Sequence, residues 1–170
     1  LGSINPVFVL PAAAKARAAD IGTTWAGSLT MGAGQFCTNP GVIFIEDRFA
    51  DTFIASASEA LTATGEQAML TVGIAEAYRQ GVARVQQIDN LHEVVGTNFT
   101  GRNALPYLFD TKLETWSAEP HLAEEVFGPL GIVVRVPSLN DFAPAARAFV
   151  GQLTATLHMD AGDTELAASL

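Results

Sequence analysis

The sequence predicts an α/β domain in which a mainly parallel β-sheet carries helices on both faces, giving three layers. Short apolar runs of strand length alternate along the chain with segments of helical periodicity, which is typical of α/β proteins. Val42–Ile45 and Gly131–Val136 are apolar at nearly every position, as expected for parallel strands buried on both faces. With 170 residues, of which 49% are hydrophobic, the chain is long enough to bury a core.

The first part of the chain predicts two strands joined by a helix and a loop. Val7–Leu10 is a buried strand, and the Ala-rich segment from Ala12 to about Thr30 is a helix. Gly32-Ala33-Gly34 ends this helix and opens a loop, which Asn39-Pro40-Gly41 closes. Val42–Ile45 follows as the second strand.

The remaining elements continue the alternation. An amphipathic helix begins at Asp47, and its apolar positions recur at helical spacing: Phe49, Phe53, Ile54, Ala57 and Leu61. Further helices are predicted at about Ile74–Ile88 (after Gly73), near Asp141–Val150, and from Asp163 to Leu170. Further strands are predicted at Val94–Val95, Leu105–Phe109, Gly131–Val136 and Leu153–His158. No internal repeat or linker interrupts the pattern, so residues 1–170 form one domain, which we expect to be cut at both ends because the chain starts at Leu1 inside an apolar run.

The composition excludes several classes of partner. Nine basic and eighteen acidic residues give a formal net charge of −9, which repels nucleic-acid phosphates and anionic lipid. No apolar run approaches the roughly 20 residues that a membrane-spanning helix needs. Cys37 is the single cysteine, which rules out an intrachain disulfide and favours a reducing compartment, most simply the cytoplasm. The three histidines, His92, His121 and His158, lack the spacing of a metal site, so we expect no metal.

Cys37 is the first candidate for chemistry. Gly32-Ala33-Gly34 differs from a dinucleotide-binding glycine loop, because it follows a helix and has cysteine at the third glycine position. A free cysteine in a globular protein is usually a small buried hydrophobic residue. Loops at strand ends, however, are where α/β enzymes place reactive groups. From the residues alone, a buried and a nucleophilic Cys37 are equally favoured.

Glu124 to Leu130 is the second candidate. Two adjacent carboxylates before Gly128-Pro129 are most simply a solvated turn. Phe127, however, lies between the acid pair and this turn, just before a buried strand. The segment can therefore present one carboxylate and one aromatic face to a ligand.

Four segments together resemble the aldehyde dehydrogenases. Gly34-Gln35-Phe36-Cys37 resembles the active-site cysteine signature of that family, and Glu125-Val126-Phe127-Gly128-Pro129 resembles its cofactor-side motif. Leu1–Pro6 resembles the tail of a third signature, whose glutamate would stand immediately before Leu1, and Gly151–Thr156 resembles a Gly-Leu-Thr-Ala strand. The residues around the cysteine, Gln35–Gly41, are most similar to those of the family branch that acts on α-ketoglutarate semialdehyde or fatty aldehydes, often with NADP.

The resemblance implies a partial catalytic domain over residues 1–170 and roles for three residues. Cys37 would attack an aldehyde as a thiolate, and the thiohemiacetal would pass through a thioester to a carboxylic acid. The cofactor is NADP or NAD, with Glu125 on the nicotinamide ribose hydroxyls and Phe127 bracketing the nicotinamide ring. Gln35 and Thr38 are expected to shape the loop without a catalytic role.

The resemblance also implies parts outside this sequence. The cofactor-binding domain, the family's oxyanion asparagine and its general-base glutamate are expected elsewhere in a longer chain, which we expect to form a homo-oligomer. The isolated segment is therefore expected to be inactive. Two alternatives stay open: a non-catalytic assembly domain, and a cysteine hydrolase or acyltransferase in which Cys37 works with a histidine such as His158.

Overall fold

A six-stranded sheet lies at the centre of the computed structural model, which describes residues 2–170. Five strands are parallel, and only the edge strand β4 is antiparallel, to its neighbour β6. The mainly parallel sheet predicted from the sequence is thus confirmed. In spatial order, the strands are β4 (His92–Val95), β6 (Tyr107–Lys112), β7 (Leu130–Val136), β2 (Val42–Glu46), β1 (Val7–Val9) and β8 (Thr156–His158).

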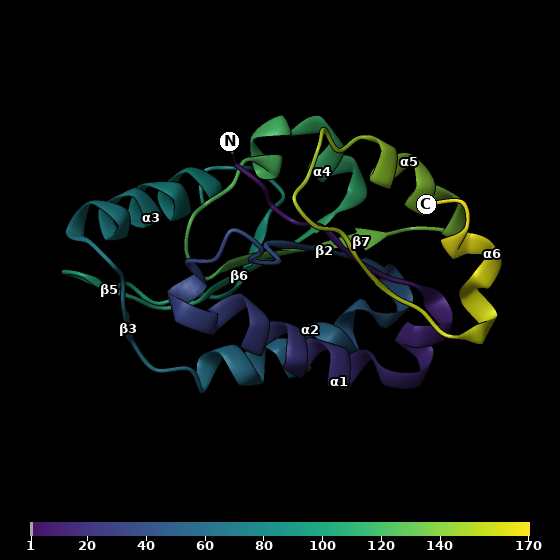
Figure 1. Ribbon diagram of the computed structural model, residues 1–170, viewed down its shortest axis with the longest axis horizontal. Coiled ribbons are helices and arrows are strands. Elements are labelled where there is room, and N and C mark those ends of the chain that lie inside the picture. The colour runs from purple at the N-terminus through teal and green to yellow at the C-terminus, as the bar shows by residue number, and fades with distance from the viewer. Residues whose placement is uncertain (1) are drawn as a thin grey trace.

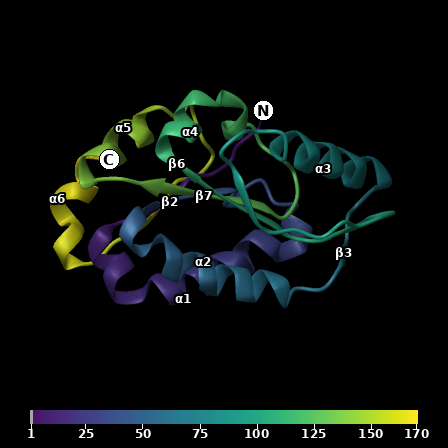
Figure 2. The same cartoon turned by 180° about the vertical axis from the view of Figure 1, so that it is seen from behind.

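Helices cover both faces of the sheet, in the three layers that the sequence predicts (Figures 1 and 2). One face carries α1 (Pro11–Thr30) and α2 (Asp47–Thr62), which pack on each other. The other face carries α3 (Val72–Val85), α4 (Leu113–Ala118) and α5 (Phe142–Arg147). The short helix α6 (Thr164–Ala167) lies at the end of the sheet, close to the start of α1 (Figure 1).

The strands supply alternate side chains to two cores. Phe8 and Phe44 belong to the core under α3, α4 and α5, and their rings stack at 5.0 Å between centroids. Val9, Ile43 and Ile45 belong to the core under α1 and α2. All five side chains are at least 97% buried, which explains why these strands lack the polar alternation of a half-exposed sheet.

The boundaries of several predicted elements differ from those observed, and hydrogen bonds explain three of the differences. Helix α3 starts at Val72 instead of Ile74, because the Thr71 hydroxyl accepts a hydrogen bond from the Ile74 N–H and caps a helix that begins two residues earlier. The last strand, β8, starts at Thr156 instead of Leu153, because the Leu153 and Thr154 N–H groups donate to side chains of the chain's first segment.

The other differences concern the ends of strands and helices. The predicted strand Leu105–Phe109 is shifted to Tyr107–Lys112, where the Tyr107 N–H begins the pairing by donating to the Pro129 carbonyl. The predicted helices Asp141–Val150 and Asp163–Leu170 are shorter, at Phe142–Arg147 and Thr164–Ala167, each after a 3-10 turn.

A small arm was not predicted. Strands β3 (Gln67–Ala68) and β5 (Asn103–Ala104) pair antiparallel outside the main sheet and project beside α3 (Figure 1). Each strand is two residues long, too short to show a period in sequence. No helix within residues 2–170 combines the length and the apolar character needed to cross a bilayer.

Candidate active site

The segments singled out in the sequence meet at one edge of the sheet. Residues 2–6 lead into β1, residues 35–41 into β2, residues 124–129 into β7 and residues 151–155 into β8. These strands are parallel neighbours, so the four segments gather at their amino ends. Ligand sites of open α/β sheets usually lie at the carboxyl ends. The candidate site is on the opposite edge because each of its segments precedes its strand.

A tight turn brings Cys37 to the surface. Helix α1 is followed by a 3-10 turn, Met31–Gly34, in which Gly32, Ala33 and Gly34 have positive φ angles of 57°, 58° and 67°. Ala33 has a Cβ in this left-handed region, where only glycine is free of strain. Cys37 follows three residues after the turn and is exposed to solvent. The thiol is therefore not part of the hydrophobic core.

Two glutamines connect this turn by hydrogen bonds to the arm and to the residues that follow β3. The Ala33 N–H donates to Oε1 of Gln67, on β3, at 2.7 Å. Gln35 accepts from the Leu70 N–H through Oε1 at 2.8 Å and donates to the Gly32 carbonyl through Nε2 at 2.9 Å. Gln35 thus shapes the loop through direct contacts, and Gln67 does so from a strand that the sequence did not reveal.

Asn5 joins three of the four segments. It is 2% exposed, and its φ is +52°. Its Nδ2 donates to the carbonyls of Cys37 at 3.0 Å, Asn39 at 2.9 Å and Ser3 at 3.2 Å. Its Oδ1 accepts from the Ser3 hydroxyl at 2.7 Å, and from both the N–H and the hydroxyl of Thr154 at 3.1 Å. Sequence reasoning did not select Asn5 as a functional residue.

Gln152 makes a second link between the first and last segments. Its Oε1 accepts from the Ile4 N–H at 2.9 Å, the Asn5 N–H at 3.2 Å and the Ser3 hydroxyl at 3.0 Å. Its Nε2 donates to the Val150 carbonyl at 2.9 Å. These bonds keep residues 151–155 against the chain's first segment, ahead of β8.

Glu125 lies beside the same first segment. Its side chain is half-buried, and Oε2 accepts a hydrogen bond from the Ser3 N–H at 3.2 Å. A Cβ added at Gly2 would lie 3.1 Å from this oxygen, so a glycine allows the close approach. Residue 1 of the third motif, and the glutamate expected before it, lie outside the described residues.

The Cys37 turn and the Glu125 segment are in direct contact. A Cβ added at Gly34 would overlap the peptide between Gly128 and Pro129, so only glycine fits at this position. Phe127, next to Gly128, is 37% exposed. The structure thus brings the backbones of the two predicted motifs together, while leaving the Phe127 ring and the Cys37 thiol accessible to solvent.

A surface hollow of about 700 Å³ opens beside Glu125, and its other lining residues include Gly2, Trp116, Phe149 and Gln152. This volume falls in the range of small-molecule sites. The hollow places the carboxylates of Glu124 and Glu125 next to apolar and aromatic side chains, which suits a ligand with hydroxyl groups next to a flat ring. Residues 2–170 contain no cluster of three or more His, Cys, Asp or Glu side chains that could hold a metal ion.

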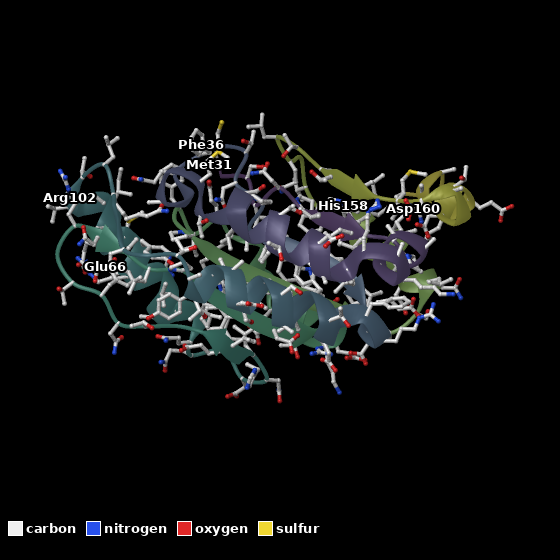
Figure 3. All side chains as sticks on the ribbon, turned by 90° about the horizontal axis from the view of Figure 1, so that it is seen from below. Met31, Phe36, Glu66, Arg102, His158 and Asp160 are labelled. Carbon is white, nitrogen blue, oxygen red and sulfur yellow. The ribbon has the colours of Figure 1, made fainter. Side chains whose placement is uncertain are left out.

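His158, the histidine considered as a partner of Cys37, lies away from the cysteine loop. His158 pairs with Val9 at the carboxyl end of β8, the opposite edge of the sheet, and Figure 3 shows it well separated from Phe36 along the molecule. Burial and the positive charge of Arg17 lower the pKa of His158. His121 contacts Glu124, with 2.8 Å between Nδ1 and Oε1. The Cys37–His158 pair that a cysteine hydrolase would need is therefore not formed.

Comparison with known proteins identifies relatives that match this chain over its whole length. The chain is 41% identical over 173 residues to alpha-ketoglutaric semialdehyde dehydrogenase 2 of Azospirillum brasilense, and this match covers all of the chain and 33% of the relative. It is 32% identical over 174 residues to alpha-ketoglutaric semialdehyde dehydrogenase of Acinetobacter baylyi, with the same coverage. The chain thus spans about a third of the length of these relatives. No protein-family model matches the sequence.

Solved structures share the fold. Gamma-glutamyl-gamma-aminobutyraldehyde dehydrogenase from Burkholderia cenocepacia matches with a TM-score of 0.84 at 19% identity, over 100% of this chain and 36% of that one. An indole-3-acetaldehyde dehydrogenase complexed with NAD+ matches with a TM-score of 0.81 at 20% identity, over 99% and 36% of the two chains. NADP-dependent glyceraldehyde-3-phosphate dehydrogenase from Bacillus halodurans, complexed with NADP, matches with a TM-score of 0.77 at 21% identity, over 100% and 37%.

Proposed function

We propose that the chain, which is similar in sequence and fold to segments of aldehyde dehydrogenases, supplies the catalytic cysteine of an NAD(P)-dependent aldehyde dehydrogenase. The observation that carries this proposal is the exposed Cys37 at the meeting point of four segments. The relatives' names make α-ketoglutaric semialdehyde the first substrate to test. Assembly as a homo-oligomer in the cytoplasm belongs to the same proposal.

Cys37 forms and breaks the covalent bond to the substrate. Its thiolate attacks the aldehyde carbon, and the carbonyl electrons move to oxygen to give a thiohemiacetal. The Cys37 backbone N–H stabilises the negative charge on that oxygen. Hydride loss from the carbon, to a nicotinamide that would be bound beside it, leaves a thioester. Water then adds to the thioester carbon, gives up one proton to solvent, and releases the Cys37 thiolate with a carboxylic acid. Covalent capture thereby divides one difficult oxidation into easier steps.

Glu125 and Phe127 fit the nicotinamide end of a dinucleotide cofactor, which supplies the hydride acceptor when bound. Glu125 lines the hollow and accepts from the Ser3 N–H through Oε2, and a carboxylate has the capacity to accept further bonds from ribose hydroxyls. The partly exposed ring of Phe127 lies in the same segment, where it can border a flat heterocycle.

Covalent labelling of Cys37 tests the proposal in the full-length protein. Iodoacetamide at neutral pH is expected to alkylate Cys37 and abolish NAD(P)-dependent oxidation of α-ketoglutaric semialdehyde. Mass spectrometry of enzyme quenched during turnover is expected to find an acyl group on Cys37, and the Cys37→Ser variant neither acylates nor turns over. Active enzyme with Cys37 unmodified after alkylation contradicts the assignment. A folded protein that never acylates supports the assembly domain instead.

A further inference from the structure

We propose that Asn5 is a positioning residue that holds the Cys37 loop in its reactive shape. The inference rests on the proposed role of Cys37 as the nucleophile. Asn5 lies on the segment that enters β1, and Cys37 lies 32 residues further along the chain on the loop that enters β2. The carboxamide of Asn5 bridges these two neighbouring strands at their amino ends.

The surroundings of Asn5 require an amide. Its Nδ2 faces three carbonyl oxygens, and its Oδ1 faces three donor groups, so the two ends of the side chain are not interchangeable. At 2% exposure, a lost partner would not be replaced by bulk water, and an unsatisfied polar group would remain. Asparagine also tolerates the left-handed backbone better than most residues with a Cβ, which suits φ of +52°.

The donor end of Asn5 fixes the loop on both sides of Thr38. It binds the Cys37 carbonyl at 3.0 Å and the Asn39 carbonyl at 2.9 Å. The turn is closed by the Asn39 N–H, which donates to the Phe36 carbonyl at 3.0 Å. The backbone of Cys37 is therefore fixed by a hydrogen bond from a buried side chain, while Cys37 itself is exposed. A nucleophile displaced by about 1 Å loses on the order of a hundredfold in rate, so this support affects reactivity directly.

The acceptor end of Asn5 connects the loop to the rest of the site. Oδ1 accepts from the Ser3 hydroxyl, and the Ser3 N–H donates to Glu125. A continuous path of hydrogen bonds and one short stretch of backbone therefore runs from the Cys37 carbonyl through Asn5 and Ser3 to Glu125. Asn5 thus sets the position of the nucleophile relative to the carboxylate assigned to the cofactor.

The Asn5→Asp variant separates the two ends of the side chain. One carboxylate oxygen still accepts from Ser3 and Thr154, while the other replaces the donor and faces the carbonyls of Cys37 and Asn39. In the full-length enzyme, we expect the rate of Cys37 alkylation and kcat to fall by about tenfold or more. The Kd for NAD(P) should change by less than about twofold, because the Ser3–Glu125 bond is retained.

Asn90→Asp is the matched control. It makes the same substitution at another asparagine with a positive φ, of 60°. Asn90 is exposed and precedes β4, which is not one of the four strands next to the site. We expect Asn90→Asp to alkylate at the wild-type rate, which separates the effect of a new charge from the loss of the bond to the Cys37 carbonyl.

Thr154→Val is the second variant, for the case that Asn5→Asp does not fold. It removes one hydroxyl donor to Asn5 and keeps the Thr154 N–H, so we expect a folded protein that alkylates about threefold more slowly. Folded Asn5→Asp enzyme that alkylates and turns over normally would overturn the inference, as would a wild-type rate in Thr154→Val when Asn5→Asp is unfolded. Slower alkylation by Asn5→Asp in a protein that oxidises no aldehyde would support the positioning role and refute the proposed function.

Discussion

At the scale of single residues, Glu124 and Glu125 are adjacent in sequence but differ in their surroundings. Glu124 is exposed and its Oε1 lies 2.8 Å from Nδ1 of His121. Both residues line the hollow, whereas Glu125 is half-buried and accepts from the Ser3 N–H. Composition and spacing could not distinguish the two carboxylates, because both precede the same Gly128-Pro129 turn. The contact with Ser3 supports Glu125 as the residue that faces the cofactor.

The first residue-scale prediction concerns the charge of Glu125. In the full-length enzyme, Glu125→Gln is expected to slow hydride transfer or weaken cofactor use by about tenfold or more, which corresponds to roughly 1.4 kcal/mol. Glutamine keeps an acceptor for Ser3, so Tm should barely change. Stopped-flow measurement of NAD(P)H formation checks the rate, and Glu124→Gln serves as the control with normal kinetics. A large drop in Tm with normal kinetics of the surviving enzyme would make Glu125 structural.

The roles of some residues at the site cannot be inferred from a single sequence, and examples are Asn5, Gln67 and Gln152. Their bonds to the site span 32, 34 and 147 to 149 positions along the chain. Asn5 and Gln152 lie in segments that resemble family signatures, but an uncharged polar side chain does not reveal its own role. That role depends on partners that only the fold brings near. Cys37 was noticeable because it is the only cysteine and follows a glycine-rich turn. The proposed nucleophile was thus recognisable in the sequence, and the residues that hold its loop were not.

At the scale of elements, helix α1 is capped by a residue from the other end of the chain. The side chain of its N-cap residue, Leu10, makes no capping hydrogen bond. Instead, Asp163 accepts from the Ala12 N–H through Oδ1 at 2.8 Å and from the Ala13 N–H through Oδ2 at 3.0 Å. The carboxylate is 3% exposed and satisfies N–H groups that a helix start leaves without partners. Its negative charge also suits the positive end of the helix dipole.

We therefore predict that Asp163→Ala destabilises the protein without changing the candidate site. The variant leaves two N–H groups of α1 unpaired, so the free energy of unfolding should fall by about 1.5–3 kcal/mol. Asp20→Ala, which removes an exposed carboxylate from the same helix, should change it by less than about 0.5 kcal/mol. Urea denaturation of the two variants makes the comparison. Equal stabilities would show that water caps α1 equally well when Asp163 is absent.

The elements also show where sequence patterns stop being informative. The apolar runs predicted the central strands because burial on both faces requires an apolar residue at nearly every position. The shortened β8 could not be foreseen, since the N–H groups of Leu153 and Thr154 are used by Ser3 and Asn5, about 150 positions away. The helix α4 was also missed, because a six-residue helix is too short to display an amphipathic period.

At the scale of the whole molecule, the sheet order determines which segments form the site. Strands β7, β2, β1 and β8 are neighbours in space although they are far apart in sequence. Their parallel directions place the segments before them on one edge. The alternation of strands and helices predicted the parallel sheet, but not the order of its strands. The sequence therefore indicated the four segments, and the fold shows how they come together.

The last prediction is that the 170-residue chain alone neither binds NAD(P) measurably nor oxidises aldehydes. The contacts proposed for the cofactor, Glu125 and Phe127, reach only its nicotinamide end. Immobilising a free ligand costs roughly 4 kcal/mol or more, which two such side chains do not offset, so Kd should be weaker than about 1 mM.

Calorimetric titration with NAD and NADP checks the affinity, and the absorbance of NAD(P)H checks turnover. Alkylation provides the internal control, because the bonds from Asn5 and Gln67 that hold the cysteine loop lie within residues 2–170. We therefore expect the isolated chain to alkylate at Cys37 while it remains unable to oxidise the aldehyde. Robust turnover by this chain would mean that the cofactor is bound by residues other than those proposed. If neither alkylation nor turnover occurs in folded protein, the reactive shape of the loop must depend on residues outside the chain.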